Sequence, residues 1–185
     1  QLLYVIASDR KRAGTLQGPV VGTVMSNLGL EQKLQAEGVE FLRAKVGDRY
    51  VLAMLKEHGG VLGGETSGHL LCLDRTTTGD GLVSALEVLA VMKRTGRPLA
   101  ELVAGMPKFP QVMINVRVRE RIDPSQSQVI QDAVRRVEKV LGSTGRVVLR
   151  ASGTEPVIRV MIEAEDEAVA SRYASELAEV VRTAI

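Results

Sequence analysis

Short apolar segments alternate with longer amphipathic ones along the first hundred residues of this chain. Residues 19–25 are β-branched and apolar, as buried strands are, and residues 39–45 are expected to form a second strand. Each is followed by a helical pattern that ends at glycine. Strands that alternate with helices in this way are typical of a parallel or mixed sheet with covering helices. The first part of the chain is therefore predicted to be an α/β domain.

The remaining elements follow the same signals. The helices expected in this part cover residues 1–13, 28–37, 49–58, 80–94 and 99–103, and two further short strands cover residues 61–62 and 70–73. Near residues 105–107 a Gly-Met-Pro segment breaks the pattern, and a domain boundary is expected there. Beyond it we expect a small α+β sandwich with strands 112–118, 146–149 and 157–162 and helices 125–141 and 167–183.

Charge and composition exclude some classes of partner. The chain carries a net charge of +2, and residues 17–106 hold nine basic and ten acidic side chains, against twelve and eleven in residues 107–185. Binding to a phosphate backbone requires a clear basic excess, and stacking on single strands requires aromatic rings, which make up only 3% of the residues. No nucleic-acid partner is expected.

The single cysteine and the hydropathy indicate a compartment. Cys72 lies in an apolar run, cannot form an internal disulfide, and is expected to be a small buried hydrophobe. We find no signal peptide and no apolar stretch near the roughly 18 residues of a membrane span. A reducing cytoplasm is predicted, without membrane attachment. Because the chain starts at Gln1 inside a helical pattern, it is expected to be a fragment of a longer protein.

The first polar motif is the segment 63–69, between two apolar strands. Its glycines, including Gly64, allow a close approach to a ligand because they have no side chain. Glu65 accepts hydrogen bonds, whereas Ser67 both donates and accepts, and this combination suits a pair of sugar hydroxyls. An ordinary hairpin with a polar tip explains the same residues, so both interpretations remain open.

The second polar motif is the segment 150–156, followed by Arg159. A guanidinium, two hydroxyls and backbone N–H groups at a glycine turn make a suitable cradle for phosphate, whose oxygens arginine binds as a fork. A hairpin loop with surface arginines is the alternative.

A third motif, Lys45 to Arg49, lies at a strand-to-helix junction. Asp48 could cap the helix N-terminus, and Lys45 and Arg49 could reach an anionic ligand at the end of the strand.

Two other charged runs are expected to have structural roles. Residues 10–12 complement a helix dipole, and the acidic run 163–167 is expected to be a solvated turn before a helix.

The segments 64–69 and 150–156, in this order and at this separation, resemble two signature loops of the α-D-phosphohexomutase superfamily. Residues 23–30, 45–50 and 76–81 are similar to the branch of that superfamily that acts on glucosamine phosphates. The similarity covers essentially the whole chain.

Members of this family have four domains. The resemblance implies that residues 1–16 end the second domain, residues 17–106 form a sugar-recognising third domain, and residues 107–185 form a phosphate-binding fourth domain. It also implies interconversion of glucosamine 6-phosphate and glucosamine 1-phosphate, a step towards UDP-N-acetylglucosamine and the cell wall. The family uses a phosphoserine, a Mg²⁺ ion and a bisphosphorylated sugar.

The family's phosphoserine loop and its three-aspartate metal loop have no counterpart in this sequence. Mg²⁺ is therefore expected to bind outside this chain, and the fragment is expected to be inactive alone. Its expected partners are a phosphosugar substrate and the missing N-terminal domains, and the oligomeric state, a homodimer included, stays open. A mutase for neutral sugars (a phosphomannomutase or phosphoglucomutase) and a non-catalytic phosphosugar-binding module are the alternatives.

Carried over position by position, the resemblance assigns roles to single residues. Glu65 and Ser67 would hold sugar hydroxyls common to both binding orientations, and His69 would lie near the phosphoserine, as a proton-transfer group or as a structural residue. The phosphate that is not reacting would be held by the second motif, through Arg150, Ser152, Gly153 and Thr154.

Two positions depart from the wider family pattern. Glucose and mannose mutases commonly have His where this chain has Asp48, and several relatives have Asn where it has Gly153. Both departures favour the glucosamine branch, and Asp48 could also sense the ammonium of an amino sugar.

Overall fold

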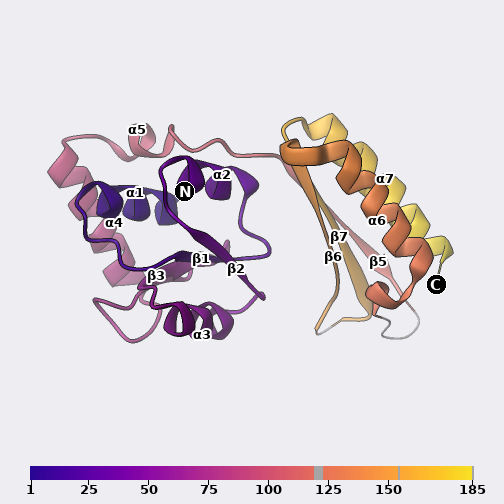
Figure 1. Cartoon of the computed structure of the whole chain (residues 1–185), viewed down its shortest axis with the longest axis horizontal. Coiled ribbons are helices and arrows are strands. Elements are labelled where there is room, and N and C mark those ends of the chain that lie inside the picture. Colours follow the sequence, from indigo (N-terminus) through magenta and orange to yellow (C-terminus); the bar gives the residue numbers. More distant parts are fainter. Residues whose placement is uncertain (119–122, 154, 185) are drawn as a thin grey trace. The chain divides into compact units, whose positions relative to one another are not determined.

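The computed structural model of the chain describes residues 1–118, 123–153 and 155–184, which fold as two compact units, Gln1–Lys108 and Phe109–Ile185 (Figure 1). Each unit has its own sheet and its own apolar core. The first helix packs into the core of the first unit. The evolutionary domain limits expected from the sequence stay predictions.

The first unit is built around a four-stranded sheet in the order β2-β1-β3-β4. β1 (Val20–Thr23) runs parallel to β2 (Phe41–Ala44) and to β3 (Leu62–Gly64), and β4 (Leu70–Cys72) is antiparallel to β3. All four residues of β1 are buried, as expected for a parallel strand that is covered on both faces. This mixed sheet with covering helices confirms the fold class predicted for the first part.

The helices of the first unit lie on both faces of this sheet (Figure 1). Val20 and Leu62 point to one face and pack against four helices: α1 (Leu2–Arg12), α2 (Leu28–Ala36), α4 (Gly81–Thr95) and α5 (Leu99–Val103). On the other face, Val21 and Leu71 pack against a single helix, α3 (Asp48–His58). The alternation of neighbouring residues between the faces follows from the two-residue repeat of a strand.

Helix α3 comes very close to the sheet at Gly63. A Cβ added there would lie 2.7 Å from Val51 Cγ1 and 3.0 Å from Leu55 Cδ1, both in buried side chains of α3. Any side chain would therefore push the helix away from the sheet. The first glycine of the first polar motif is therefore explained by packing, because it fixes the height of α3 above the sheet.

The basic run at the end of α1 is more than a complement to the helix dipole. Arg10 is 5% exposed and binds two carboxylates, Asp74 at 2.9 Å and Glu87 at 3.0 Å, which tie α1 to the turn after β4 and to α4. Asp9, also buried, pairs with Arg94 at the end of α4. The dipole interpretation of this run was therefore incomplete for Arg10.

The second unit is a sheet covered on one face. Strands β5 (Gln111–Arg117), β7 (Val157–Ala164) and β6 (Gly145–Ala151) form an antiparallel sheet in this order. Helices α6 (Gln128–Leu141) and α7 (Glu167–Thr183) lie side by side on the same face of it (Figure 1). Single 3₁₀ turns, Pro124–Gln126 and Gly142–Thr144, flank α6. The small α+β sandwich predicted from the sequence is confirmed.

The face of this sheet that the helices leave uncovered carries polar rows across the strands. Glu163 of β7 lies opposite Gln111 of β5 and Arg146 of β6. Its carboxylate accepts hydrogen bonds from Arg146 Nε at 2.6 Å and from Gln111 Nε2 at 3.2 Å, and its side chain is fully buried. The prediction of a solvated turn for the whole acidic run was wrong at this residue, because β7 extends through it.

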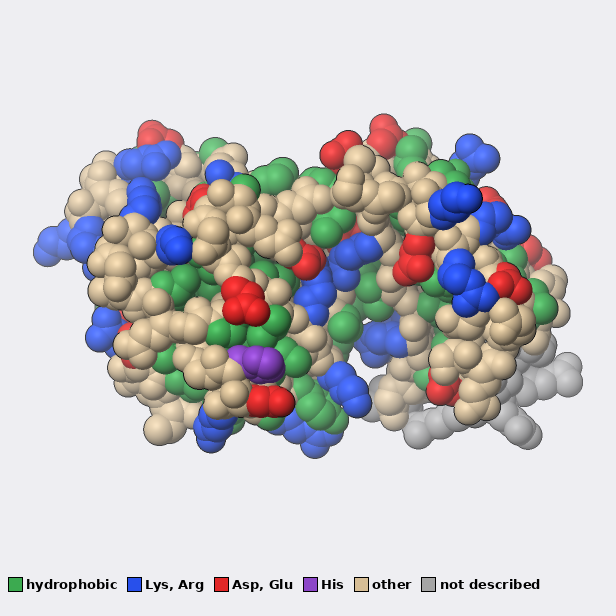
Figure 2. Space-filling view, in the orientation of Figure 1, with side chains coloured by type: hydrophobic (Ala, Val, Ile, Leu, Met, Phe, Trp, Pro, Cys, Tyr) green, Lys and Arg blue, Asp and Glu red, His purple; other side chains and the backbone are tan. Residues whose placement is uncertain are grey.

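Acidic and basic side chains are interspersed on the surface of each unit shown in Figure 2. Within the described residues, no helix is both long and apolar enough to span a bilayer.

Replacing Arg10 with alanine should destabilise the first unit by about 3 kcal/mol. Removing one partner of a buried ion pair costs about 3–5 kcal/mol, and the partial exposure of Asp74 and Glu87 favours the lower end. Urea denaturation measures the loss. The control is Arg97→Ala, because the pair between Arg97 and Glu101 is about half exposed and should contribute roughly 0–1 kcal/mol. Equal losses in the two variants would contradict a structural role for the buried network.

Candidate functional site

Two loops of the first unit begin where parallel strands end. Residues 45–49 follow β2 and residues 65–69 follow β3, and both strands flank β1. The carboxyl ends of parallel strands lie at one edge of a sheet, where α/β proteins bind ligands. The two loops start two strand spacings apart, roughly 10 Å. A hydrogen bond of 2.7 Å from Gly47 N–H to Glu65 Oε1 joins them across the end of β1.

The turn after β3 is held by its backbone. Glu65 N–H donates to the His69 carbonyl at 2.9 Å, and Gly68 N–H donates to the Glu65 carbonyl at 3.1 Å. Ser67 and His69 are exposed, whereas the Glu65 side chain is only 10% exposed. His69 Nδ1 lies 3.9 Å from Glu65 Oε2, so the imidazole and the carboxylate can face one ligand. Gly64 is the buried last residue of β3.

The loop after β2 differs from its predicted form at one position. Gly47, rather than Asp48, is the N-cap of α3, and Asp48 is the first helical residue, with its carboxylate accepting a hydrogen bond from Arg49 N–H at 2.7 Å. The prediction that Asp48 caps the helix was therefore wrong by one residue. The side chains of Lys45 and Asp48 are exposed and accessible to a ligand.

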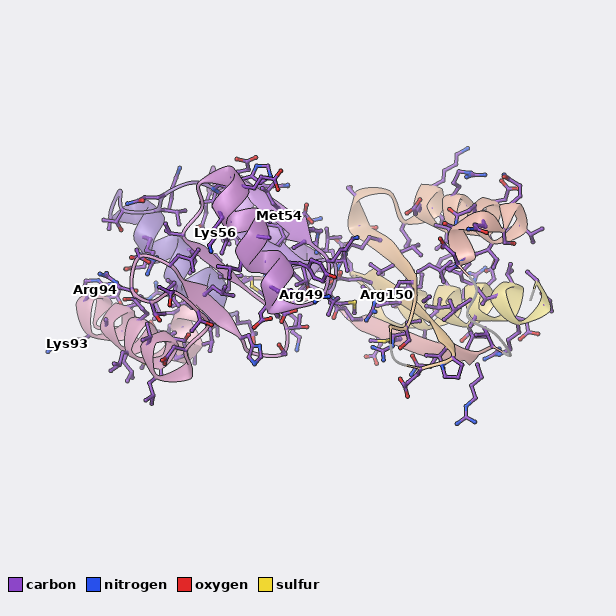
Figure 3. All side chains as sticks on the ribbon, turned by 90° about the horizontal axis from the view of Figure 1, so that it is seen from below. Arg49, Met54, Lys56, Lys93, Arg94 and Arg150 are labelled. Carbon is purple, nitrogen blue, oxygen red and sulfur yellow. The ribbon has the colours of Figure 1, made fainter. Side chains whose placement is uncertain are left out.

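Arg49 lies at the start of α3, at the other end of the helix from Lys56 (Figure 3). Its guanidinium carbon lies 4.6 Å from the centre of the Tyr50 ring, and its Nη2 donates to the Tyr50 hydroxyl at 2.7 Å. Stacking holds the guanidinium while most of its N–H donors remain available for an anion.

Arg150 belongs to strand β6, not to the loop that the sequence predicted (Figure 3). The register places it directly opposite Arg159 of β7, in a row with Asn115 of β5, on the face that the helices leave uncovered. Like charges directly opposite each other in an antiparallel pair destabilise a sheet. This arrangement therefore costs stability, in contrast to the nearby row in which Arg146 is neutralised by Glu163.

The two guanidinium groups have unused hydrogen-bond donors. The Nε atoms of Arg150 and Arg159 are buried, and neither finds an acceptor in the described part of the chain. Arg159 Nη2 contacts the exposed carboxylate of Glu155 at 3.2 Å. Burial and, after it, the charge of Arg159 lower the pKa of the Arg150 guanidinium. Two clustered guanidiniums with spare N–H groups are suited to a phosphate, which supplies both charge and several acceptor oxygens.

The loop that follows β6 is folded back by Ser152. This residue is 5% exposed, its N–H donates to the Val157 carbonyl at 2.9 Å, and its Oγ accepts from Glu155 N–H at 3.2 Å. Gly153 is exposed at the tip of the loop. Thr154, which is also part of the predicted phosphate cradle, lies outside the described residues.

Sequence reasoning missed two contributors. Gly47 contributes through its backbone N–H, and a glycine between a strand and a helix was the signal that could have identified it. Glu155 pairs with Arg159, and its four-residue separation from that arginine does not show whether the pair forms.

The described residues support neither a cysteine nucleophile nor a metal site. Cys72 is buried, and burial raises the pKa of its thiol, which makes it a poor nucleophile. No group of three or more His, Cys, Asp and Glu side chains that could hold a metal ion occurs in the part of the chain that the structure describes.

Comparison with known families gives two matches, one after the other along the chain. Residues 1–109 match the model for the phosphoglucomutase/phosphomannomutase alpha/beta/alpha domain III, and residues 113–180 match the model for the phosphoglucomutase/phosphomannomutase C-terminal domain.

Curated relatives are similar over nearly the whole chain. A phosphoglucosamine mutase from Alkalilimnicola ehrlichii is 57% identical over 99% of this chain, and one from Methylococcus capsulatus is 55% identical over 100%. In both cases the chain spans 41% of the relative's length.

Solved structures share the fold. The N-acetylphosphoglucosamine mutase of Aspergillus fumigatus superposes with a TM-score of 0.84 at 18% identity, over 99% of this chain and 43% of that one. A phosphoglucomutase/phosphomannomutase family protein from Burkholderia thailandensis gives a TM-score of 0.76 at 24% identity, over 99% and 41%.

Replacing Arg150 with methionine should slightly stabilise the second unit in phosphate-free buffer. Removing one of two opposed like charges should gain roughly 0.2–1 kcal/mol. Added phosphate should raise the melting temperature of the wild type and not that of the variant, since ligand binding stabilises the folded state. Thermal melting with and without phosphate measures both effects.

The matched control is Arg146→Met, on the same strand and face. That change leaves Glu163 buried without its cation and should destabilise the unit by about 3–5 kcal/mol. A comparable loss in Arg150→Met would show that Arg150 is a structural residue.

Proposed function

This chain belongs to the phosphoglucomutase/phosphomannomutase family, and from that premise we propose that it is the substrate-recognising part of a phosphoglucosamine mutase. The longer enzyme would interconvert glucosamine 6-phosphate and glucosamine 1-phosphate, an isomerisation that moves a phosphoryl group between two sugar oxygens. The curated relatives that carry this name are more than twice as long as the chain, which spans 41% of them. The chain supplies recognition and other parts of the enzyme supply the transfer.

The observation that carries this proposal is the pair of opposed guanidinium groups on β6 and β7. Arg146, in the nearby polar row, has a buried carboxylate partner. Within the described residues, Arg150 and Arg159 have only the exposed Glu155, which pairs with Arg159. A sheet face that retains this repulsion and buried N–H groups without described acceptors gains stability only when an anion binds. We assign this position to the phosphate that is not reacting, with Ser152 and Gly153 closing the loop beside it.

Sugar recognition is assigned to the loops after β2 and β3. The Glu65 carboxylate would accept hydrogens from two ring hydroxyls, and the exposed Ser67 hydroxyl would donate or accept beside it. Lys45 and Arg49 are cations at the same sheet edge and would attract the anionic substrate. Asp48, exposed on the first turn of α3, would favour an ammonium group on the sugar over a hydroxyl.

His69 is proposed as a proton-transfer group. Its imidazole is exposed, with Nδ1 at 3.9 Å from Glu65 Oε2, so it can approach a sugar oxygen that Glu65 holds. Imidazole is the side chain that most often serves as a general acid or base, which suits transfer of a proton to or from a hydroxyl. The backbone carbonyl of His69 also accepts a hydrogen bond from Glu65 N–H, but any residue could supply this contact, so it does not account for the imidazole.

Mg²⁺ and the phosphoserine are proposed to lie outside this chain. An Aspergillus fumigatus N-acetylphosphoglucosamine mutase of the same fold has been solved in complex with GlcNAc-6P and magnesium. When bound, the ion would neutralise charge on the transferred phosphoryl group. The residues of this chain hold and orient the sugar and its second phosphate. We also propose a cytoplasmic location and the N-terminal domains of the same enzyme as partners.

The 185-residue chain should bind glucosamine 6-phosphate but should not convert it, even with Mg²⁺ and glucosamine 1,6-bisphosphate present. The longer enzyme should convert it and should act faster on glucosamine phosphate than on glucose phosphate. Coupled assays and calorimetric titration give these readings. Turnover by the pure chain would refute the division of labour, and faster turnover of glucose phosphate would make a neutral-sugar mutase the better assignment.

Glu65→Gln in the longer enzyme should lower kcat/KM about tenfold to a hundredfold in both directions, corresponding to roughly 1.4–2.7 kcal/mol. The variant keeps the shape of the side chain but replaces one acceptor oxygen with a donor, and both substrate orientations use the same carboxylate. Steady-state kinetics in both directions measure the effect, with Glu57→Gln on the exposed side of α3 as the control. A defect in one direction only would contradict shared recognition of the sugar.

A further inference from the structure

Gly47 occupies a special position between the two sugar loops. Its N–H donates to Glu65 Oε1 at 2.7 Å, while its carbonyl accepts the first hydrogen bonds of α3, from Tyr50 N–H at 2.9 Å and Val51 N–H at 3.3 Å. The N–H of Gly47 therefore binds the Glu65 carboxylate, while its carbonyl binds the first turn of α3. Moving Gly47 would disturb both.

The bond to Gly47 divides the two oxygens of the Glu65 carboxylate. Oε1 is fixed to the Gly47 amide, whereas Oε2 lies 3.9 Å from Nδ1 of the exposed His69. The Glu65 side chain has only 10% of its surface exposed. One oxygen is therefore an anchor, and the direction in which the other faces depends on where the Gly47 N–H points. The carboxylate also lies at the start of α3, where the helix dipole favours negative charge.

Only glycine adopts the backbone angles found here without strain. Gly47 has φ 126° and ψ 127°, a region that residues with a side chain rarely enter. A Cβ at this position would also lie 3.2 Å from Cδ2 of Tyr50, the residue on which Arg49 stacks. An alanine would relax towards negative φ, and this rotation would turn the N–H away from Glu65.

We propose that Gly47 is a positioning residue for sugar recognition: its N–H anchors one oxygen of Glu65 and so aims the other oxygen at the substrate. This inference rests on the proposed role of Glu65 in holding the sugar. It also couples the loop after β2 to the turn after β3, because a shift of residues 45–49 moves the carboxylate. Gly47 acts through Glu65 and does not touch the reacting atoms.

The contact can be tested in the 185-residue chain without any substrate. An amide that donates to a carboxylate loses a charge-assisted hydrogen bond when the carboxyl is protonated. In ¹H–¹⁵N spectra, the resonance of the Gly47 amide proton should therefore move upfield when the pH is lowered until Glu65 is protonated. Glu65→Gln should abolish this movement. A Gly47 resonance that does not change with pH in the wild type would overturn the proposal, even if no variant of Gly47 folds.

The function is tested in the longer enzyme with Gly47→Ala in two backgrounds. Gly47→Ala should lower kcat/KM for glucosamine 6-phosphate about tenfold. In a Glu65→Ala background it should have no further effect, because the group it positions is gone. The matched control is Gly59→Ala, which places alanine at a left-handed residue (φ 67°) at the other end of α3, where a Cβ meets nothing within 4 Å.

The kinetic results distinguish a failure of this inference from a failure of the proposed function. Equal losses from Gly47→Ala in both backgrounds, or a loss no larger than that of Gly59→Ala, would overturn the positioning role alone. Unchanged kinetics in Glu65→Ala would overturn the sugar-binding role of Glu65, and the inference with it. A loss confined to Gly47→Ala with Glu65 present, together with the titrating amide, is the result we expect.

Discussion

The burial of β1 on both faces is the constraint on which the site of the first unit depends. With α3 on one side and four helices on the other, no residue of this strand is available to a ligand. Polar chemistry can then appear only where the neighbouring strands leave the sheet, and parallel pairing puts the ends of β2 and β3 at the same edge. Beyond the end of β1, the Glu65 carboxylate accepts a hydrogen bond from Gly47 N–H, which links the two loops that flank this buried strand.

In the second unit, polar side chains lie on the sheet itself, because the helices cover only one of its faces. Alternate residues of three strands then share the other face, and the antiparallel register sorts them into rows. The row through Glu163 is balanced in charge and buried, as a structural ion pair should be. The row through Arg150 and Arg159 is unbalanced. In the proposed function, this strand pair exchanges some stability for the ability to bind an anion.

Arginines in this protein therefore have two distinct kinds of surroundings, which the partners of each guanidinium distinguish. Arg10 and Arg43 are fully engaged: Arg10 binds two carboxylates, and Arg43 binds Glu31 and the carbonyls of Thr23 and Ser26. Each of them fastens one segment to another. Arg150, in contrast, faces a second arginine. Hydrogen-bond satisfaction separates the fastening arginines from Arg150, the one proposed to bind a ligand, more clearly than exposure does, since all three are at least partly buried.

The sequence alone determined the elements, the mixed α/β architecture followed by an α+β sandwich, and the segments 64–69 and 150–156 as the candidates for ligand binding. The spacing of apolar residues, the glycines at the ends of helices and the unusual polar clusters are local signals. Local signals are sufficient to predict the elements, the architecture and the candidate segments. Only the tertiary structure decided that Arg150 opposes Arg159, that Glu163 is buried, and that a glycine amide holds Glu65. Each of these depends on register or on a contact between distant segments. The pattern within a single segment does not encode such contacts, because they arise only when strands pair and helices pack.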